Sequence, residues 1–122
     1  MKIEVSNGEI LDKLTILKIK LKNVKDEEKL KHVRNEHDFL ENISMNINYD
    51  TNLFEQLLII NNKLWDIEDA IRNKERANEF DDEFITLARS VYFTNDKRAK
   101  IKKDLNIQTN SNFVEIKSYN KY

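Results

Sequence analysis

The longest hydrophobic pattern in the chain lies between residues 53 and 75. Apolar side chains recur there at alternating intervals of four and three residues, which places them on one face of an α-helix. They are Leu53, Leu57, Ile60, Leu64, Ile67 and Ile71. Charged residues join this face in its second half, at Glu68, Arg72 and Glu75. Because charged groups are costly to bury without partners, the change marks either a structural ion-pair network or a polar site.

Similar coiled-coil-like patterns predict three more helices, each beginning at a residue suited to cap it. The first cap is part of an S-x-x-E capping box, in which Ser6 and Glu9 satisfy backbone groups reciprocally. The other expected caps are Asp26, Asp50 or Thr51, and Asp81. The predicted helices span residues 7–25, 27–43, 51–77 and 82–105. Residues 94–96 favour local backbone bonds and leave a break in the last helix open, although one continuous helix is favoured.

Short connections between these helices predict that sequence neighbours run antiparallel. Residues 2–5 and 113–119 alternate polar and apolar side chains, so both are expected to be extended and can pair with each other. A chain of 122 residues supports one domain. We therefore predict a single all-α domain, a four-helix bundle of two antiparallel hairpins with short extended segments at its ends. The long seam also allows a homodimer.

Composition supports the helical prediction and narrows the classes of function. Charged residues make up 35% of the chain, with one Gly and no Pro, which is typical of exposed helices with few breaks. The 21 basic and 22 acidic residues nearly cancel, and this balance argues against nucleic acid binding. The basic run at residues 97–103 is interpreted as a solvated end of a helix.

The compartment is predicted from residues that the chain lacks. It has no cysteine, which fits a reducing compartment. No apolar run reaches the roughly 18 residues that a membrane span needs. Residues 1–5 lack the apolar core of a secretory signal. We expect a cytoplasmic protein without a membrane partner.

The polar line on the third predicted helix is the first candidate for chemistry. In an antiparallel hairpin Glu68 would lie close to residues 91–95, and Asn61 would lie close to Arg98. Carboxylates and guanidinium groups would then meet between the helices. Such a cluster is either a pocket for a charged small molecule or metal ion, or a satisfied network that fixes helix register. The structural interpretation is favoured, because ion-pair networks often cluster in this way.

Paired acidic residues are the second candidate. Glu9 and Asp12 stand three apart, as do Asp66 and Asp69, and carboxylates spaced like this on facing helices hold Mg²⁺ in all-α nucleotide pyrophosphohydrolases. Asp66 and Asp69 lie away from the hydrophobic seam, however, so caps and surface charge explain the spacing better. The two histidines are five residues apart and do not share a helical face. We predict no metal site and no cofactor.

Three blocks of sequence together resemble a small bacterial family of unknown function. They are S-x-G-E-x-x-D-K at residues 6–13, L-W-x-I-E-D-x-I-R at 64–72 and L-A-R-S-V-Y-x-x-N-D-x-R-A at 87–99, with a tail at 114–119. The match is poorest over the second predicted helix. The resemblance implies a compact helical domain with no established activity, whose genes often lie beside those for surface-polysaccharide assembly. It singles out Ser6 and Asp69 and the residues of our candidate polar cluster: Glu9, Asp12, Lys13, Trp65, Glu68, Arg72, Arg89, Asn95, Asp96 and Arg98.

Charges at seam positions, and the lack of catalytic motifs, favour a binding or assembly module. Its polar groove would lie between the first, third and fourth helices, and its partner would be an unknown protein or a small anionic ligand. The alternative is a small enzyme that acts on a nucleotide or sugar phosphate, with or without Mg²⁺. Arg72 and Arg98 would then hold the anion, and Glu68 or Asp12 would serve as acid, base or metal ligand. Catalytic residues are not assigned.

Overall fold

The computed structural model describes residues 1–113, and over these residues the chain is all-α, without a β-strand. The helices are α1 (Asn7–Asn23), α2 (Glu27–Ser44), α3 (Thr51–Arg76) and α4 (Asp82–Gln108). Each begins where an N-cap side chain accepts a hydrogen bond from a backbone N–H of the first turn. These caps are Ser6, Asp26, Asp50 and Asp81. The predicted all-α fold of four packed helices is confirmed.

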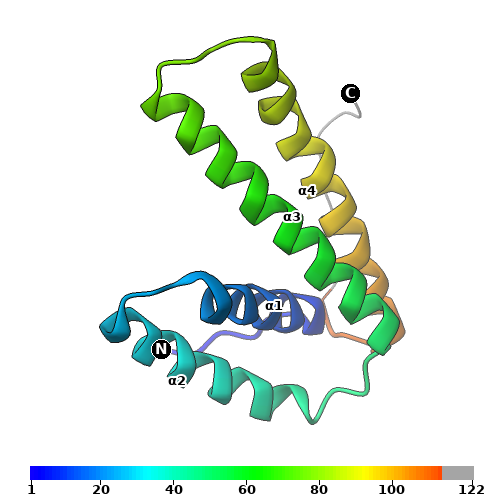
Figure 1. The fold of residues 1–122 in the computed structure, drawn as a ribbon. Helices are drawn as coiled ribbons and strands as arrows, with labels where there is room; N and C mark the ends of the chain where they lie inside the picture. The colour runs from blue at the N-terminus through cyan, green and yellow to red at the C-terminus, as the bar shows by residue number, and fades with distance from the viewer. Residues whose placement is uncertain (114–122) are drawn as a thin grey trace.

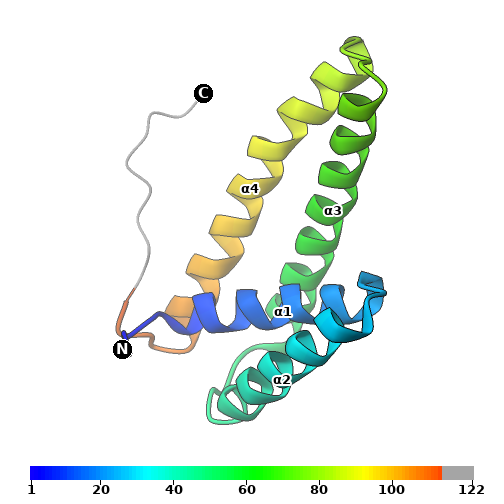
Figure 2. The same ribbon diagram turned by 90° about the vertical axis from the view of Figure 1, so that its left-hand side faces the viewer.

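The helices form two antiparallel hairpins of different length, which cross each other (Figure 1). Helices α1 and α2 form a layer across one end of the longer α3–α4 hairpin, and the other end of that hairpin projects well beyond them (Figure 2). Helix α1 packs against all three other helices, whereas α2 packs against α1 alone. The contact between the two hairpins is therefore made by α1.

A small apolar core lies where the hairpins cross. Leu11 of α1, Leu57 of α3 and Leu105 of α4 are fully buried and contact one another. The connection between α2 and α3 covers this core with Ile47 and Tyr49. The remaining partly buried side chains packed against it are Leu53, Phe54 and Ile101. Since the core sits at one end of α3 and α4, the opposite end of their hairpin is stabilised mainly by contacts between those two helices.

The polar residues inside α4 do not interrupt it. Thr94 is buried, and the helix continues without a break to Gln108, three residues beyond the predicted end. Helix α1 ends at Asn23 and α3 at Arg76, slightly before their predicted ends. Local capping patterns therefore located the starts of the helices better than their ends.

The two ends of the described chain lie side by side. The side chain of Asn112 donates a hydrogen bond to Glu4 at 2.8 Å, and the backbone N–H of Asn7 donates to Ser111 Oγ at 2.9 Å. Residues 2–5 form neither helix nor strand. Most of the segment predicted to pair with them, residues 114–119, lies outside the described residues. No helix of the described part is long and apolar enough to cross a membrane.

Candidate functional site

A buried carboxylate, Asp12 of α1, joins three helices. Only 1% of this residue is exposed. The guanidinium of Arg98 on α4 donates two hydrogen bonds to this carboxylate, from Nε to Oδ1 at 2.9 Å and from Nη2 to Oδ2 at 2.5 Å. Asn61 of α3 donates from Nδ2 to Asp12 Oδ1 at 2.8 Å. Bidentate Arg–carboxylate pairs are among the strongest and most directional polar contacts in proteins, so this arrangement fixes α1 against α3 and α4.

Thr15 completes the buried part of this network. Its hydroxyl donates to the backbone carbonyl of Asp12 at 2.6 Å, and its oxygen accepts from Asn61 Nδ2 at 2.7 Å. Asp12 and Thr15 are three residues apart on α1, so they share the helical face that meets α3. Among the described residues, no buried side-chain nitrogen or oxygen lacks a hydrogen-bond partner. The network is therefore satisfied from within the chain.

A second ion pair lies at the rim of the network. Lys102 Nζ is 2.7 Å from Glu9 Oε2 and 3.9 Å from Asp12 Oδ2. Lys102 follows Arg98 by four residues on α4, so both cations face the first turns of α1. The side chain of Arg98 is 28% exposed. Two carboxylates and two cations thus meet at this junction, and their charges balance.

Gly8 permits the close approach of α1 to α4 at the same junction. Its backbone N–H donates to Asn106 Oδ1 at 2.6 Å, and Asn106 is almost completely buried. A Cβ atom at Gly8 would lie 2.6 Å from the backbone oxygen of Lys102. The chain has a single glycine. Its position inside a predicted helix was a signal of close packing that the sequence prediction did not use.

The other charged residues of the candidate cluster lie on the surface. Glu68 and Asp69 form exposed ion pairs with Arg72 along α3, at 3.7 and 3.5 Å. Lys13 pairs with Glu36 of α2 at 3.4 Å, and both side chains are about half exposed. The carboxylate that pairs with a guanidinium between the helices is therefore Asp12. Glu68 instead lies on the exposed surface of α3.

The remaining cluster residues lie along the projecting hairpin. Arg89 Nε donates to the hydroxyl of Tyr92 at 3.3 Å, and its guanidinium lies 6.0 Å from the centre of the Phe93 ring. Three residues are partly buried, which are Trp65, Asn95 and Asp96. The structure thus brings Glu9, Asp12 and Arg98 of the predicted cluster together at one junction. The other cluster residues lie outside this junction.

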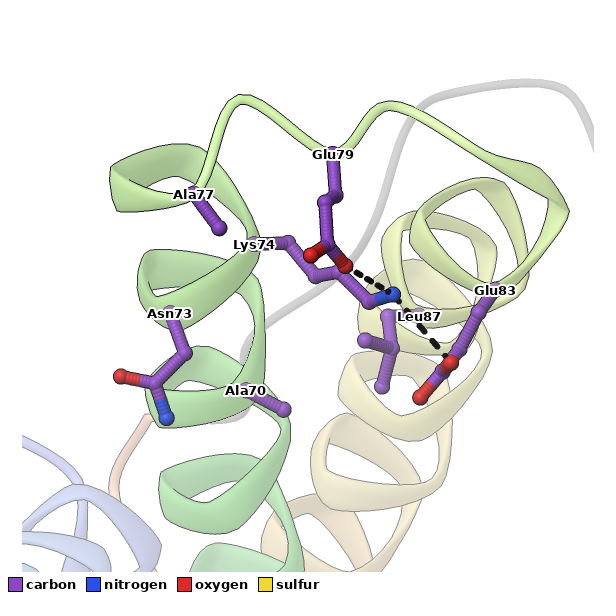
Figure 3. Close-up of a pocket in the computed structure, with 7 residues that line it drawn as sticks. All are labelled: Ala70, Asn73, Lys74, Ala77, Glu79, Glu83 and Leu87. Carbon is purple, nitrogen blue, oxygen red and sulfur yellow. Dashed lines mark hydrogen bonds and ion pairs between the residues drawn. The ribbon is translucent and has the colours of Figure 1, made fainter.

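The tip of the α3–α4 hairpin is held by one lysine and three carboxylates. Lys74 Nζ lies 3.0 Å from Asp81. It also lies 3.1 Å from Glu79 and 3.2 Å from Glu83, beside a pocket of about 370 Å³ (Figure 3). Hydrogen bonds to Asp81 and Glu79 raise the pKa of Lys74. The pKa of Asp81 is lowered, first by the bond from the Phe84 backbone N–H and then by Lys74. This cluster closes the loop between the two helices.

One group of side chains between α1 and α2 has the spacing of metal ligands. His37, Asp38 and Glu41 are the described residues whose ligand atoms lie close enough together. Lys18 of α1 already faces them, with Nζ 3.3 Å from His37 Nε2 and 3.7 Å from Glu41 Oε1. Because a lysine ammonium supplies the positive charge at this position, we interpret the group as a contact between two helices.

The fold is all-α, and a buried Asp–Arg–Asn network joins its two hairpins. The chain belongs to DUF6165, a family of unknown function, whose model matches residues 1–122. A search of the curated proteins and a search of the solved structures each returned no significant match. The family match agrees with the expected resemblance to a family of unknown function, and it adds no activity.

Proposed function

We propose that this protein is a cytoplasmic binding or assembly module in which the Asp12 junction is a structural lock. One observation carries the proposal: Asp12 is almost completely buried, and its oxygens already accept hydrogen bonds from Arg98 and Asn61. A ligand would have to displace these partners to reach the carboxylate. The junction therefore serves to set the angle between the hairpins, and recognition takes place elsewhere on the molecule.

The projecting end of the α3–α4 hairpin is the surface best placed for recognition. It extends beyond the α1–α2 layer in both views (Figures 1 and 2). Large apolar side chains remain exposed along it, including Ile85, Tyr92 and Phe93. A pair of amphipathic helices buries mainly the seam between them, so within residues 1–113 much of its outer surface is exposed.

The enzymatic alternative requires arginines that can hold a phosphate. Arg98 is engaged with the buried Asp12, and Arg72 forms ion pairs with Glu68 and Asp69 on the surface of α3. These two arginines thus belong to separate places in the fold. The geometry favours the binding module over an enzyme acting on a nucleotide or sugar phosphate.

A thermal shift assay separates the two functions. The full chain would be heated with nucleotides and sugar phosphates, each with and without Mg²⁺, at concentrations far above a plausible dissociation constant. A ligand that binds the native state must raise the melting temperature. We expect no shift for any member of the panel. A clear shift, together with turnover that disappears in a folded Glu68→Gln or Asp12→Asn variant, would overturn the proposal.

A further inference from the structure

Two hollows lie on the same flank of the α3–α4 hairpin, one near its tip and one near its base. The tip pocket is lined by Ala70 and Asn73 of α3, by the C-cap residue Ala77, and by Glu79 and Glu83. The base groove, also about 370 Å³, is lined on α3 by Gln56, Ile59 and Ile60, and on α4 by Lys97, Lys100, Ile101 and Asp104. On α3, positions 56, 59, 70 and 73 share one helical face. Helix α1 packs through Asn61, on a different face of α3, and so leaves this flank open within the described residues.

The two hollows carry opposite charge. At the tip, Glu79, Asp81 and Glu83 surround the single ammonium of Lys74, and all three carboxylates are at least half exposed. This leaves an excess of negative charge at the start of α4. At the base, Lys97 and Lys100 border the groove, where Lys100 Nζ already lies 2.9 Å from Asp104 Oδ2. Two cations against one carboxylate give this groove an excess of positive charge. One flank of one hairpin therefore has an acidic end and a basic end.

Exposed apolar side chains occur in the base groove, on α4 and at the tip of the hairpin. Ile59 in the base groove is 59% exposed, Phe93 in the middle of α4 is 44% exposed, and Phe80 at the tip is 54% exposed. Side chains of this size favour burial against a partner. Exposed Lys63 and Asp66 lie between the two hollows on the same face of α3, so the middle of the flank is mixed polar and apolar. A flank with opposite charges at its two ends is complementary to an antiparallel copy of itself.

We propose that a second copy of this chain occupies this flank, in an antiparallel dimer whose two-fold axis passes near residues 91 and 92 of α4. The acidic tip of each copy then faces the basic groove of the other, and symmetry repeats the contact. With Glu83 opposite Lys100 of the second copy, the overlap spans about 26 Å of α4, at about 1.5 Å per residue. This proposal rests on the proposed function, because it names the partner of the projecting hairpin.

The size of the flank indicates which class of protein interface the dimer would have. A surface about 26 Å long and two helices, or about 20 Å, wide buries on the order of 1,000 Å² over both copies. This lies near the lower limit for specific protein interfaces, so the dimer should dissociate reversibly. Since charge complementarity supplies the register, association should weaken as salt screens the contacts between Glu83 and Lys100.

Sedimentation equilibrium of the full chain tests the dimer directly. We expect a monomer–dimer equilibrium whose dissociation constant rises with ionic strength. Each of the variants Glu83→Lys and Lys100→Glu places like charges opposite each other and should raise the dissociation constant about tenfold or more. A matched control is Lys31→Glu on the exposed surface of α2, which should leave the dissociation constant unchanged. Circular dichroism would verify that each variant is folded.

Combining the two charge-reversal variants distinguishes this pairing from a general loss of stability. A mixture of the two single variants should form heterodimers, because each copy again faces the opposite charge at both contacts. The double variant Glu83→Lys/Lys100→Glu should recover self-association for the same reason. A chain that is monomeric at every concentration, or single variants that dimerise normally, would overturn the dimer. If the dimer is overturned but no ligand raises the melting temperature, the proposed binding module is unaffected. If a nucleotide or sugar phosphate raises the melting temperature, the proposed function itself is overturned.

Discussion

Asp12 occupies an environment that an isolated carboxylate could not tolerate. Burial of a charge is costly, and here the cost is offset by a bidentate guanidinium and by the amide of Asn61. Such a cluster often contributes little more to stability than apolar residues of the same volume would. The network instead fixes the relative orientation of α1, α3 and α4, because only one placement of these helices satisfies every donor and acceptor.

Removal of the charge at Asp12 should therefore be strongly destabilising. In Asp12→Asn the guanidinium of Arg98 loses its countercharge, and the new amide must also face the amide of Asn61. Breaking a buried pair typically costs about 3–5 kcal/mol. Because Arg98 is 28% exposed and can turn toward water, we expect about 2–3 kcal/mol here, measured as the free energy of unfolding in urea.

Glu68→Gln is the matched control for this substitution. It neutralises a carboxylate whose ion pair with Arg72 is exposed, so it should change the free energy of unfolding by less than about 0.5 kcal/mol. Equal losses in the two variants would show that Asp12 has no special role as a lock.

The pH dependence at the hairpin tip follows from Asp81 and Lys74. The pKa of Asp81 is lowered from 3.8, so its contribution to stability is present above that value and is lost as the pH falls through its folded pKa. The pKa of Lys74 is raised from 10.5, so its contribution is present below that value and is lost as the pH rises through its folded pKa. We expect carboxyl NMR titration of Asp81 to give a midpoint below 3.8. Lys74→Met should move that midpoint upward, and an unchanged midpoint would contradict the assigned ion pair.

At the level of elements, the helices were predictable because the signals that form them are local. Capping side chains and the seam from Leu53 to Ile71 need only neighbours within a few residues. The crossing of the hairpins was not predictable in this way. Apolar stripes with this spacing suit both a bundle of nearly parallel helices and two crossed hairpins, and the choice depends on contacts between distant residues.

The residues of the candidate site were harder to predict from the sequence than the helices were. Adjacent residues on a helix differ in direction by about 100°, so a charge beside the seam can point either to a neighbouring helix or to water. Asn61 points to Asp12, whereas Glu68 points outward. The proximity of Asn61 to Arg98 followed from antiparallel pairing alone. The carboxylate that joins them comes from α1, whose position relative to α3 and α4 no local pattern specifies.

The approach of α1 to α4 yields a prediction about Gly8. In Gly8→Ala the new methyl group would meet the Lys102 carbonyl at 2.6 Å, and this backbone atom cannot move without displacing α4. Overpacking of this kind costs about 1–3 kcal/mol, which exceeds the gain of up to about 1 kcal/mol in helix propensity. Urea unfolding should show a net loss of stability. Asn35→Ala on exposed α2 offers a control, where the propensity gain acts alone. Stabilisation by both substitutions would show that the helices separate easily at this point.

For the molecule as a whole, the arrangement makes α1 the link between two unequal halves. Among the described residues, helix α2 contacts α1 alone, and its buried residues are His37 and Ser44. Helices α3 and α4 share a long seam and the fully buried Leu57 and Leu105. Segments with few buried contacts open at lower free energy than the core, so the halves should differ in local stability.

Native-state hydrogen exchange measures this difference. Amides of α2 should exchange fastest among the four helices, and those of α3 and α4 around Leu57 and Leu105 should exchange slowest. Asp12→Asn weakens the lock between the hairpins, so exchange in α1 and α2 should rise about 30-fold or more, which corresponds to about 2 kcal/mol in the opening free energy. Amides in the projecting part of α3 and α4 should change less, and Glu68→Gln should leave the pattern unaltered. If Asp12→Asn instead raised exchange equally in all four helices, the molecule would open as one cooperative unit, and the description of α1–α2 as a separately locked layer would be wrong.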